Sequence, residues 1–126
     1  MSEASGDTVL LVRAGGRACA LPLAHVIETL RPVRTMPCAG LPPFVLGAAV
    51  VRGAAVPVVK LDLFLGTGPS AATRFVLVRC GAHAAALAVD AVSGVASLAG
   101  VERAATPLLG AEVEGAVEAL GALDGE

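Results

Sequence analysis

The sequence contains no tryptophan and no tyrosine, and its aromatic side chains are limited to three phenylalanines. It also lacks a basic cluster, because nine Lys and Arg residues are scattered among eleven Asp and Glu residues, for a net charge of −2. Proteins that bind nucleic acids neutralise phosphates with several Lys and Arg side chains, and many stack bases on aromatic rings. Both features are missing from the sequence, so we expect no nucleic acid partner.

The cysteines form no recognisable disulfide or metal-binding pattern. The sequence forms no CxxC motif, and its two histidines make no ligand pattern with the three cysteines, which are Cys19, Cys38 and Cys80. Isolated cysteines in odd number favour small buried side chains in a reducing compartment over a disulfide framework or a metal site. The N-terminus MSEASGDT lacks the charged and then apolar pattern of a secretory signal. We therefore expect a cytoplasmic protein without metals or cofactors.

One segment could be mistaken for a membrane span, namely residues 41–59, in which Arg52 is the single charge. Three prolines and two glycines interrupt this segment. An arginine at the centre of a span costs about 2.5–3.5 kcal/mol on insertion scales. Two short core strands explain the segment better, so we predict no direct membrane insertion. The length of 126 residues is that of a single domain.

What the chain does contain is a series of short apolar runs, rich in Ala and Val, separated by glycines and prolines. A spacing of about 8–12 residues between such runs favours an all-β barrel or sandwich. The runs predict strands at residues 8–13, 17–23, 48–51, 54–59, 74–80, 84–90 and 91–98. The expected core residues include Val56, Val58, Val76, Val78 and Leu87. A strand, a glycine turn and a second strand occur in this order twice, which indicates two small barrels of similar plan.

The helical elements are predicted to be short. Residues 62–65 and residues 43–46 each precede a glycine, and the second segment starts with a proline, so both patterns favour a helical turn. Two further segments fit either a strand or a helix, because their apolar side chains recur at both spacings. These are residues 25–30 and residues 112–123.

The apolar run at residues 46–61 contains an Arg-Gly pair near its centre. Glycine reaches the positive φ that a two-residue hairpin turn requires, so we predict that Arg52 and Gly53 connect two strands. Arg52 is then either a solubilising charge or a contact for another protein, and the residues alone do not separate the two roles. We expect Lys60 to be a solvated strand end and Asp90 to fix a turn or cap local backbone groups.

Taken together, these segments resemble the CheW-like domain of bacterial chemotaxis over residues 8–123. The resemblance rests on the order of several segments, which are residues 10–23, 26–28, 36–37, 41–47, 52–59, 74–78 and 87–92. The Arg-Gly pair and the Val-Pro-Val-Val run after it match the most recognisable motif of the family. Two positions differ from the family pattern: Val50 stands where Asn is usual, and Lys60 stands where Asp is usual.

The resemblance implies an all-β fold of two interlocked five-stranded SH3-like barrels with short helical turns. The single domain would comprise a flexible N-terminus at residues 1–7 and barrel halves at about residues 8–66 and 73–123. The family consists of non-enzymatic adaptors that couple the cytoplasmic tips of chemoreceptors to the regulatory domain of the histidine kinase CheA. The resemblance places the protein-interaction surface at Arg52, Gly53, Glu28, Val26 and Val51, with Arg52 paired to Glu28.

The end of the sequence suggests an alternative. The family continues past the Asp124-Gly125 turn with a last strand, so we expect the second half to lack that strand. An unpaired edge is a template for another chain. We therefore expect either a homodimer through the open edge or an edge that local rearrangement protects. The alternative function is a truncated CheW-like paralogue that acts as a self-assembling or structural module without coupling.

An enzyme is the third class considered. Nucleophilic catalysis requires a Ser/His/Asp or Cys/His arrangement, and acid–base hydrolysis requires paired carboxylates. The sequence shows none of these at a recognisable spacing, and no glycine-rich phosphate loop opens a helix. We therefore predict that the protein is not an enzyme.

Overall fold

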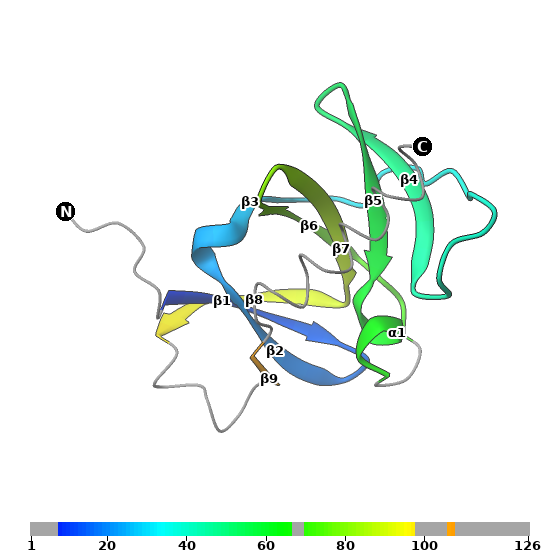
Figure 1. The fold of residues 1–126 in the computed structure, drawn as a ribbon. Coiled ribbons are helices and arrows are strands. Elements are labelled where there is room, and N and C mark those ends of the chain that lie inside the picture. Colours follow the sequence, from blue (N-terminus) through cyan, green and yellow to red (C-terminus); the bar gives the residue numbers. More distant parts are fainter. Residues whose placement is uncertain (1–7, 67–69, 98–105, 108–126) are drawn as a thin grey trace.

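The computed structural model describes residues 8–66, 70–97 and 106–107 (Figure 1). The described part of the chain consists mainly of strands, as the sequence predicts. In chain order the elements are β1 (Thr8–Ala14), β2 (Arg17–Pro22), the 3-10 helix η1 (Leu23–His25), β3 (Val26–Leu30), β4 (Val45–Val51), β5 (Ala54–Lys60), α1 (Leu61–Leu65), β6 (Arg74–Cys80), β7 (His83–Val89), β8 (Ala91–Ser97) and β9 (Thr106–Pro107).

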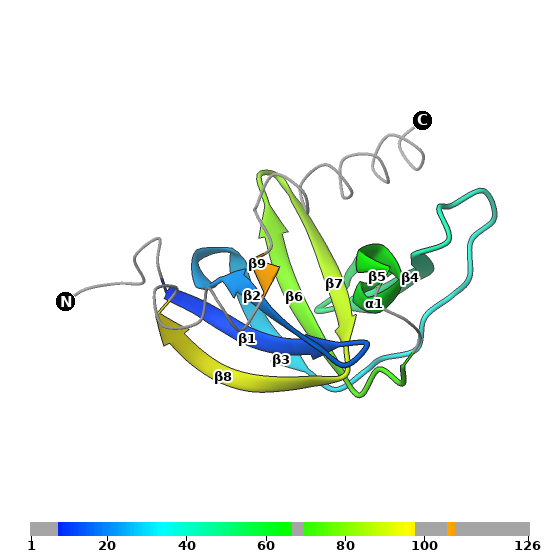
Figure 2. The same cartoon turned by 90° about the horizontal axis from the view of Figure 1, so that it is seen from below.

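The strands form two sheets that exchange strands between the two halves of the chain. One sheet has the order β8-β1-β2-β9, and the other has the order β3-β6-β7-β5-β4. Figure 2 shows β1 and β8 side by side, with the β6–β7 hairpin rising from the other sheet. Each sheet therefore combines strands from both sides of residues 67–69, and the architecture is the interlocked all-β fold that was predicted. The exact limits of the two barrel halves stay a prediction.

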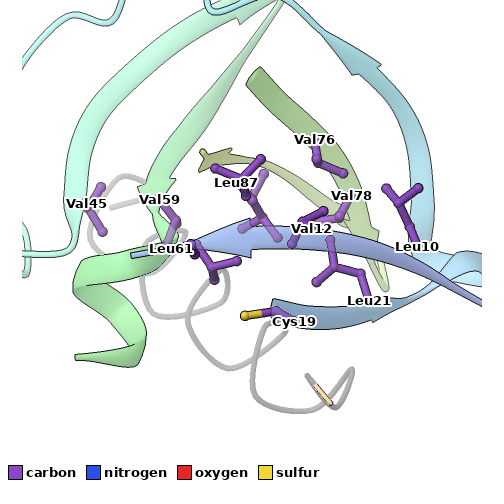
Figure 3. Close-up of a cluster of buried hydrophobic side chains, with 13 residues drawn as sticks. Leu10, Val12, Cys19, Leu21, Val45, Val59, Leu61, Val76, Val78 and Leu87 are labelled. Atoms are coloured by element: carbon purple, nitrogen blue, oxygen red, sulfur yellow. The ribbon is translucent and has the colours of Figure 1, made fainter. Parts of the chain in front are cut away.

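The main core lies between the two sheets (Figure 3). A second cluster lies on the other face of the five-stranded sheet. Because side chains alternate along a strand, β6 contributes Val76 and Val78 to the first cluster and Phe75 and Leu77 to the second. All five predicted core residues are buried, and each contributes about 1.5–3 kcal/mol if fully buried. They are Val56, Val58, Val76, Val78 and Leu87.

Two helical predictions have different outcomes. The turn predicted at residues 62–65 is confirmed as α1, and Gly66 ends it in a left-handed conformation. The turn predicted at residues 43–46 is shorter than expected: the Val45 N–H donates to the carbonyl oxygen of Pro42 (3.0 Å) and closes a turn at residues 43–44, but it is not helical, because Val45 already belongs to β4 and lies opposite Val59. The ladder between β4 and β5 therefore extends further toward the N-terminus than the proline and glycine signals suggest. No helix among the described residues is long and apolar enough to cross a membrane.

Two segments had a pattern that fitted both a strand and a helix, and the structure decides between these for one of them. Residues 26–30 form strand β3, while His25 ends the short helix η1 before it. The C-terminal segment at residues 112–123 lies outside the described residues. The expected absence of a last strand lies outside them as well. Strand β9, which pairs in parallel with β2, was not predicted.

A close backbone contact fixes the start of β4. The N–H of Met36 donates to the carbonyl oxygen of Ala48 (2.8 Å), and the N–H of Ala48 donates to the carbonyl oxygen of Met36 (3.0 Å). Gly47 lies beside this pair with a φ of 144°, and a Cβ atom there would lie 2.0 Å from the Met36 carbonyl oxygen. Glycine is therefore required at this position both for conformation and for space.

Candidate functional site

The tip of the β4–β5 hairpin carries the Arg-Gly pair, at the top of Figure 1. Val51 lies opposite Ala54, so Arg52 and Gly53 form a two-residue turn, with φ values of 55° and 80°. Two positive φ values are typical of the type I′ turn that suits tight hairpins. Within the described ranges, Arg52 is the one non-glycine residue with positive φ. Glycine would adopt this conformation at lower cost, and such outliers concentrate at functional sites.

Arg52 forms the ion pair with Glu28 that the resemblance implied. The Arg52 Nε and Nη2 atoms donate to the two carboxylate oxygens of Glu28 at 2.9 Å and 2.6 Å. The hydrogen bond from Arg52 lowers the pKa of Glu28 and raises that of Arg52. The Arg52 side chain is nevertheless 74% exposed. Exposed ion pairs contribute little to stability, so this one orients two charges at the surface rather than holding the fold together.

The other predicted site residues lie at different depths. Val51 is buried in the second cluster and is 6% exposed, and Val26 is half-buried against the main core. Val50 is 68% exposed, because neighbouring residues of a strand point to opposite faces. The structure therefore places Val51 beneath the surface and Val50 on it. Alternation along β4 separates Val50 from Val51, but four apolar residues in a row at 48–51 do not show in the sequence which of the two is exposed.

These observations define a hairpin surface at the end of the five-stranded sheet. Glu28 belongs to β3 and Arg52 to the β4–β5 turn, so the ion pair joins the strand at one edge of the sheet to the turn at the other. Ala55 lies opposite Val50 and is exposed as well. The hairpin surface comprises Glu28, Val50, Arg52, Gly53 and Ala55.

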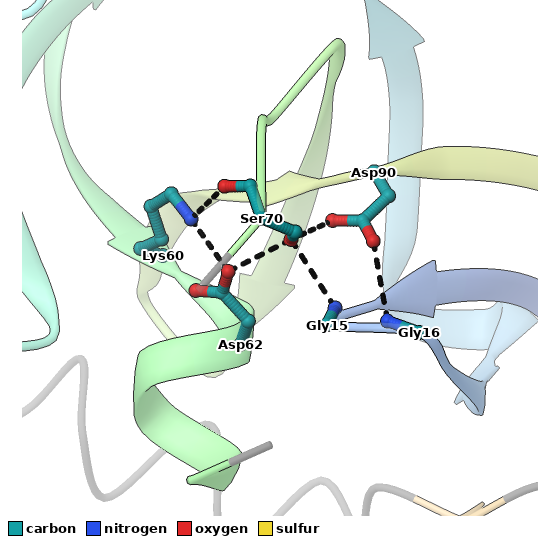
Figure 4. Close-up of polar contacts among 6 residues, drawn as sticks. All are labelled: Gly15, Gly16, Lys60, Asp62, Ser70 and Asp90. Atoms are coloured by element: carbon teal, nitrogen blue, oxygen red, sulfur yellow. Dashed lines mark hydrogen bonds and ion pairs between the residues drawn. The ribbon is translucent and has the colours of Figure 1, made fainter. Parts of the chain in front are cut away.

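A second polar feature is a cluster at the opposite end of β5, shown in Figure 4. The Lys60 Nζ atom donates to Asp62 Oδ2 (2.6 Å) and to the carbonyl oxygen of Ser70 (2.6 Å). The Lys60 side chain is 17% exposed and that of Asp62 is 1% exposed. The prediction that Lys60 is a solvated strand end is therefore wrong, because the first turn of α1 places a buried counter-charge beside it.

Asp90 connects this cluster to the β1–β2 turn. The N–H of Gly16 donates to Asp90 Oδ2 (3.4 Å), and the N–H of Asp90 donates to the carbonyl oxygen of Arg13 (2.8 Å). The Ser70 hydroxyl group contacts a carboxylate oxygen of Asp90 and also Asp62 Oδ2 (2.8 Å). Asp90 thus fixes a turn, as expected, but the turn is one that lies far away in the sequence.

The ion pair of Asp62 makes stability depend on pH. Burial raises the pKa of Asp62, but hydrogen bonds from Lys60 and Ser70 outweigh this effect, so the pKa lies below its ordinary value of 3.8. Asp62 therefore stabilises the fold above pH 3.8, and this contribution is lost as the pH falls through the folded-state pKa. We expect the free energy of unfolding of wild type and Asp62→Asn to differ most near neutral pH, and this difference to shrink as the pH falls from 3.8 through the lower folded-state pKa of Asp62.

Urea unfolding at a series of pH values measures this difference directly. Titration of all other carboxylates affects both proteins and cancels in the comparison. A difference that is the same at neutral and acidic pH would show that the Asp62 charge is not its source.

Cys19 and Cys38 take no part in either polar feature, and the side chain of Cys80 lies outside what the structure describes. Cys19 is buried and Cys38 is exposed, and neither is in a disulfide. Burial raises the pKa of the Cys19 thiol, which keeps it protonated. The expectation of buried cysteines is thus wrong for Cys38, because the connection between β3 and β4 that carries it lies on the surface. In the described part of the chain, no group of three or more His, Cys, Asp or Glu residues could hold a metal ion.

Comparison with known proteins gives the family. The family model described as the CheW-like domain matches residues 8–126. The chain belongs to the CheW-like domain family. This CheW-like domain resembles the crystal structure of the scaffolding protein TtCheW from Thermoanaerobacter tengcongensis, with a TM-score of 0.68 and 24% sequence identity. The match covers 75% of this chain and 66% of that protein, just under two thirds of its length, and it shows the shared fold. A search of curated proteins gave no match.

Val50 and Lys60 are the two positions at which the sequence differs from the pattern of the CheW-like family, and the structure places them differently. Val50 is exposed on the hairpin surface, so this departure changes the face that a partner would meet. Lys60 is largely enclosed and paired with Asp62, so its altered charge is compensated inside the protein. One departure therefore lies on the surface and the other in the interior.

Proposed function

We propose that this CheW-like domain is a non-enzymatic adaptor in the cytoplasm that couples chemoreceptors to a CheA-type histidine kinase. The observation that carries the proposal is the conformation of Arg52. Its φ of 55° is unfavourable for any residue with a side chain, and its ion pair with Glu28 lies at the surface. A residue that costs backbone free energy and adds little stability is best explained by contact with another protein.

The composition of the hairpin surface supports this role. Arginine is enriched in protein interfaces, and apolar side chains form their centres. Here the ion pair holds Arg52 in one orientation beside the exposed side chain of Val50. A side chain that is already fixed loses less conformational entropy when a partner binds. The proposed partners are the regulatory domain of the kinase and the cytoplasmic tip of a receptor, and the function needs surface complementarity rather than a reacting group.

A pull-down with both partners from the same organism tests the coupling. We expect wild type to bind, and Arg52→Ala and Arg52→Gly to lose at least about tenfold in affinity, which is a typical loss for an arginine at the centre of an interface. Arg52→Gly separates contact from structure, because glycine adopts the positive φ freely and should leave the stability unchanged or higher. Arg79→Ala serves as the matched control, since Arg79 is another exposed arginine at this end of the five-stranded sheet but takes no part in the ion pair between Arg52 and Glu28.

The self-assembling module is the second candidate, and β8 favours it. This edge strand has the sequence AVSGVAS, pairs with β1, and carries none of the charges or prolines that usually protect an edge. Light scattering on the wild-type sample separates the candidates. A monomer that binds both partners supports the adaptor. A dimer that binds neither partner rejects the adaptor, and an Arg52→Gly variant that binds like wild type rejects the hairpin surface.

A further inference from the structure

The described part of the chain has a charge balance unlike that of the whole. It contains eight Lys and Arg residues but three Asp and Glu residues, a formal net charge of +5, whereas the whole chain has a net charge of −2. All three carboxylates are also engaged by neighbouring groups. Glu28 is paired with Arg52, Asp62 is paired with Lys60, and Asp90 accepts a hydrogen bond from Gly16. Among the described residues, six arginines lie outside these two ion pairs.

Two of these arginines lie at the β1–β2 turn. Arg13 and Arg17 flank the turn and are both exposed, and the Arg13 guanidinium donates to the carbonyl oxygen of Gly16 (2.6 Å). The hydrogen bond from the Asp90 N–H to the Arg13 carbonyl oxygen attaches this turn to the junction of β7 and β8. The two arginines thus lie beside the end of β7.

Two more arginines reach the same end of the molecule from other strands. Arg74 begins β6 and lies opposite Val89, the last residue of β7. Leu30 lies opposite Phe75, so Arg31, the next residue along, lies beside Arg74. Arg31 is exposed and Arg74 is half-buried. The cationic end is defined by Arg13, Arg17, Arg31 and Arg74.

Among the described residues, the cationic end keeps an excess of positive charge, because its four arginines face one nearby carboxylate that no cation pairs with, Asp90, while Asp62 is paired with Lys60. Asp62 and Asp90 belong to the polar cluster beneath it, where Lys60, Ser70 and a backbone N–H occupy their oxygens. Among the residues that the structure describes, no carboxylate forms an ion pair with any of the four arginines. An excess of charge of one sign at one end of a protein steers oppositely charged partners toward it.

We propose that the cationic end binds an acidic segment of a partner protein. All four cations are arginines, whose planar guanidinium groups match carboxylates in a bidentate geometry. Nucleic acid fits less well, because the three phenylalanines are buried or half-buried and offer no ring for base stacking.

The position of the cationic end suits an adaptor, although the inference goes beyond the proposed coupling. Strand β5 runs from Ala54, beside the hairpin surface, to Lys60, in the cluster under the cationic end (Figure 1). Six residues of strand span about 20 Å. Two partners could therefore be held at once without competing for the same surface.

Binding of a fluorescent decaglutamate peptide to the full chain tests the proposal. We expect the wild type to bind the peptide, with an affinity that falls at least about tenfold when salt is raised from about 50 to about 300 mM, because salt screens exposed charges. Arg17→Glu and Arg31→Glu should each weaken binding about tenfold. Arg79→Glu makes the same charge change at the opposite end of β6 and should alter the affinity by less than about twofold.

The remaining outcomes overturn the proposal. Absence of binding by the wild type would do so, as would an equal loss in Arg79→Glu, which would indicate a response to net charge alone. Tighter binding to a DNA duplex, or to vesicles that contain phosphatidylserine, would assign the surface to a different class of partner. The pull-down of kinase and receptor depends on Arg52, so failure of one experiment leaves the other unaffected.

Discussion

Gly47→Ala is expected to lower the free energy of unfolding by roughly 3–5 kcal/mol, a large part of the stability of a small domain. Two causes add together. An alanine would have to adopt a φ of 144°, and its Cβ atom would lie 2.0 Å from the carbonyl oxygen of Met36. That oxygen accepts a hydrogen bond from Ala48, so the backbone cannot withdraw without breaking the contact that starts β4.

Gly94→Ala provides the matched control. Gly94 lies in β8 with a φ of 147°, almost the same as at Gly47, but no atom lies within 4 Å of the position of an added Cβ. We expect this variant to lose about 1–3 kcal/mol, from backbone conformation alone. Urea unfolding of both variants gives the two losses. Equal losses would contradict a role for the close contact with Met36.

Lys60→Met is expected to destabilise the protein by about 3–5 kcal/mol, because it leaves the buried carboxylate of Asp62 without its counter-charge. Methionine keeps the length and the apolar part of the side chain, so packing changes little. The Ser70 carbonyl oxygen loses its donor in the same variant. The loss would be measured at neutral pH, where Asp62 is ionised.

The double variant Lys60→Met/Asp62→Asn tests whether the two charges act as a pair. Removing the buried charge together with its partner should recover at least about half of the lost stability, since neutral replacements avoid the cost of an isolated ion. A double variant whose loss equals the sum of the two single losses would show that Lys60 and Asp62 act independently. The cost of Lys60→Met would then have to come from the contact with Ser70.

Local signals in the sequence predicted most of the strands and the main turn. The Arg-Gly pair at residues 52–53 lies between two apolar runs, and a two-residue turn with positive φ follows from that pattern alone. The helical turn expected at residues 43–46 rested on equally local signals, but the structure has only a short non-helical turn at residues 43–44 before β4 begins. There the pairing of Val45 with Val59 determined the conformation, and a long-range pairing cannot be detected within four residues.

The candidate sites show the same limit. Alternation along β4 places Val50 and Val51 on opposite faces, so one exposed valine beside the turn was within reach of the sequence, although the apolar run at 48–51 does not show which one it is. The enclosure of Lys60 was not within reach, because it depends on where α1 and Ser70 lie in space. The cationic end was also hidden, since Arg17 and Arg74 reach the same end of the molecule only after several strands have paired. A sequence in which basic residues are scattered can thus still fold into a charged surface.

The exchange of strands between the sheets has a consequence for how the chain folds during synthesis. Strand β1 leaves the ribosome first, but one of its two neighbours is β8, whose last residue, Ser97, pairs with Thr8. The first sheet therefore stays incomplete until most of the chain has been made. Contacts between such distant segments slow folding, because a long loop must close before any pairing energy is gained. Cutting the chain between its two halves would leave each fragment with unsatisfied strand edges rather than with an independent barrel.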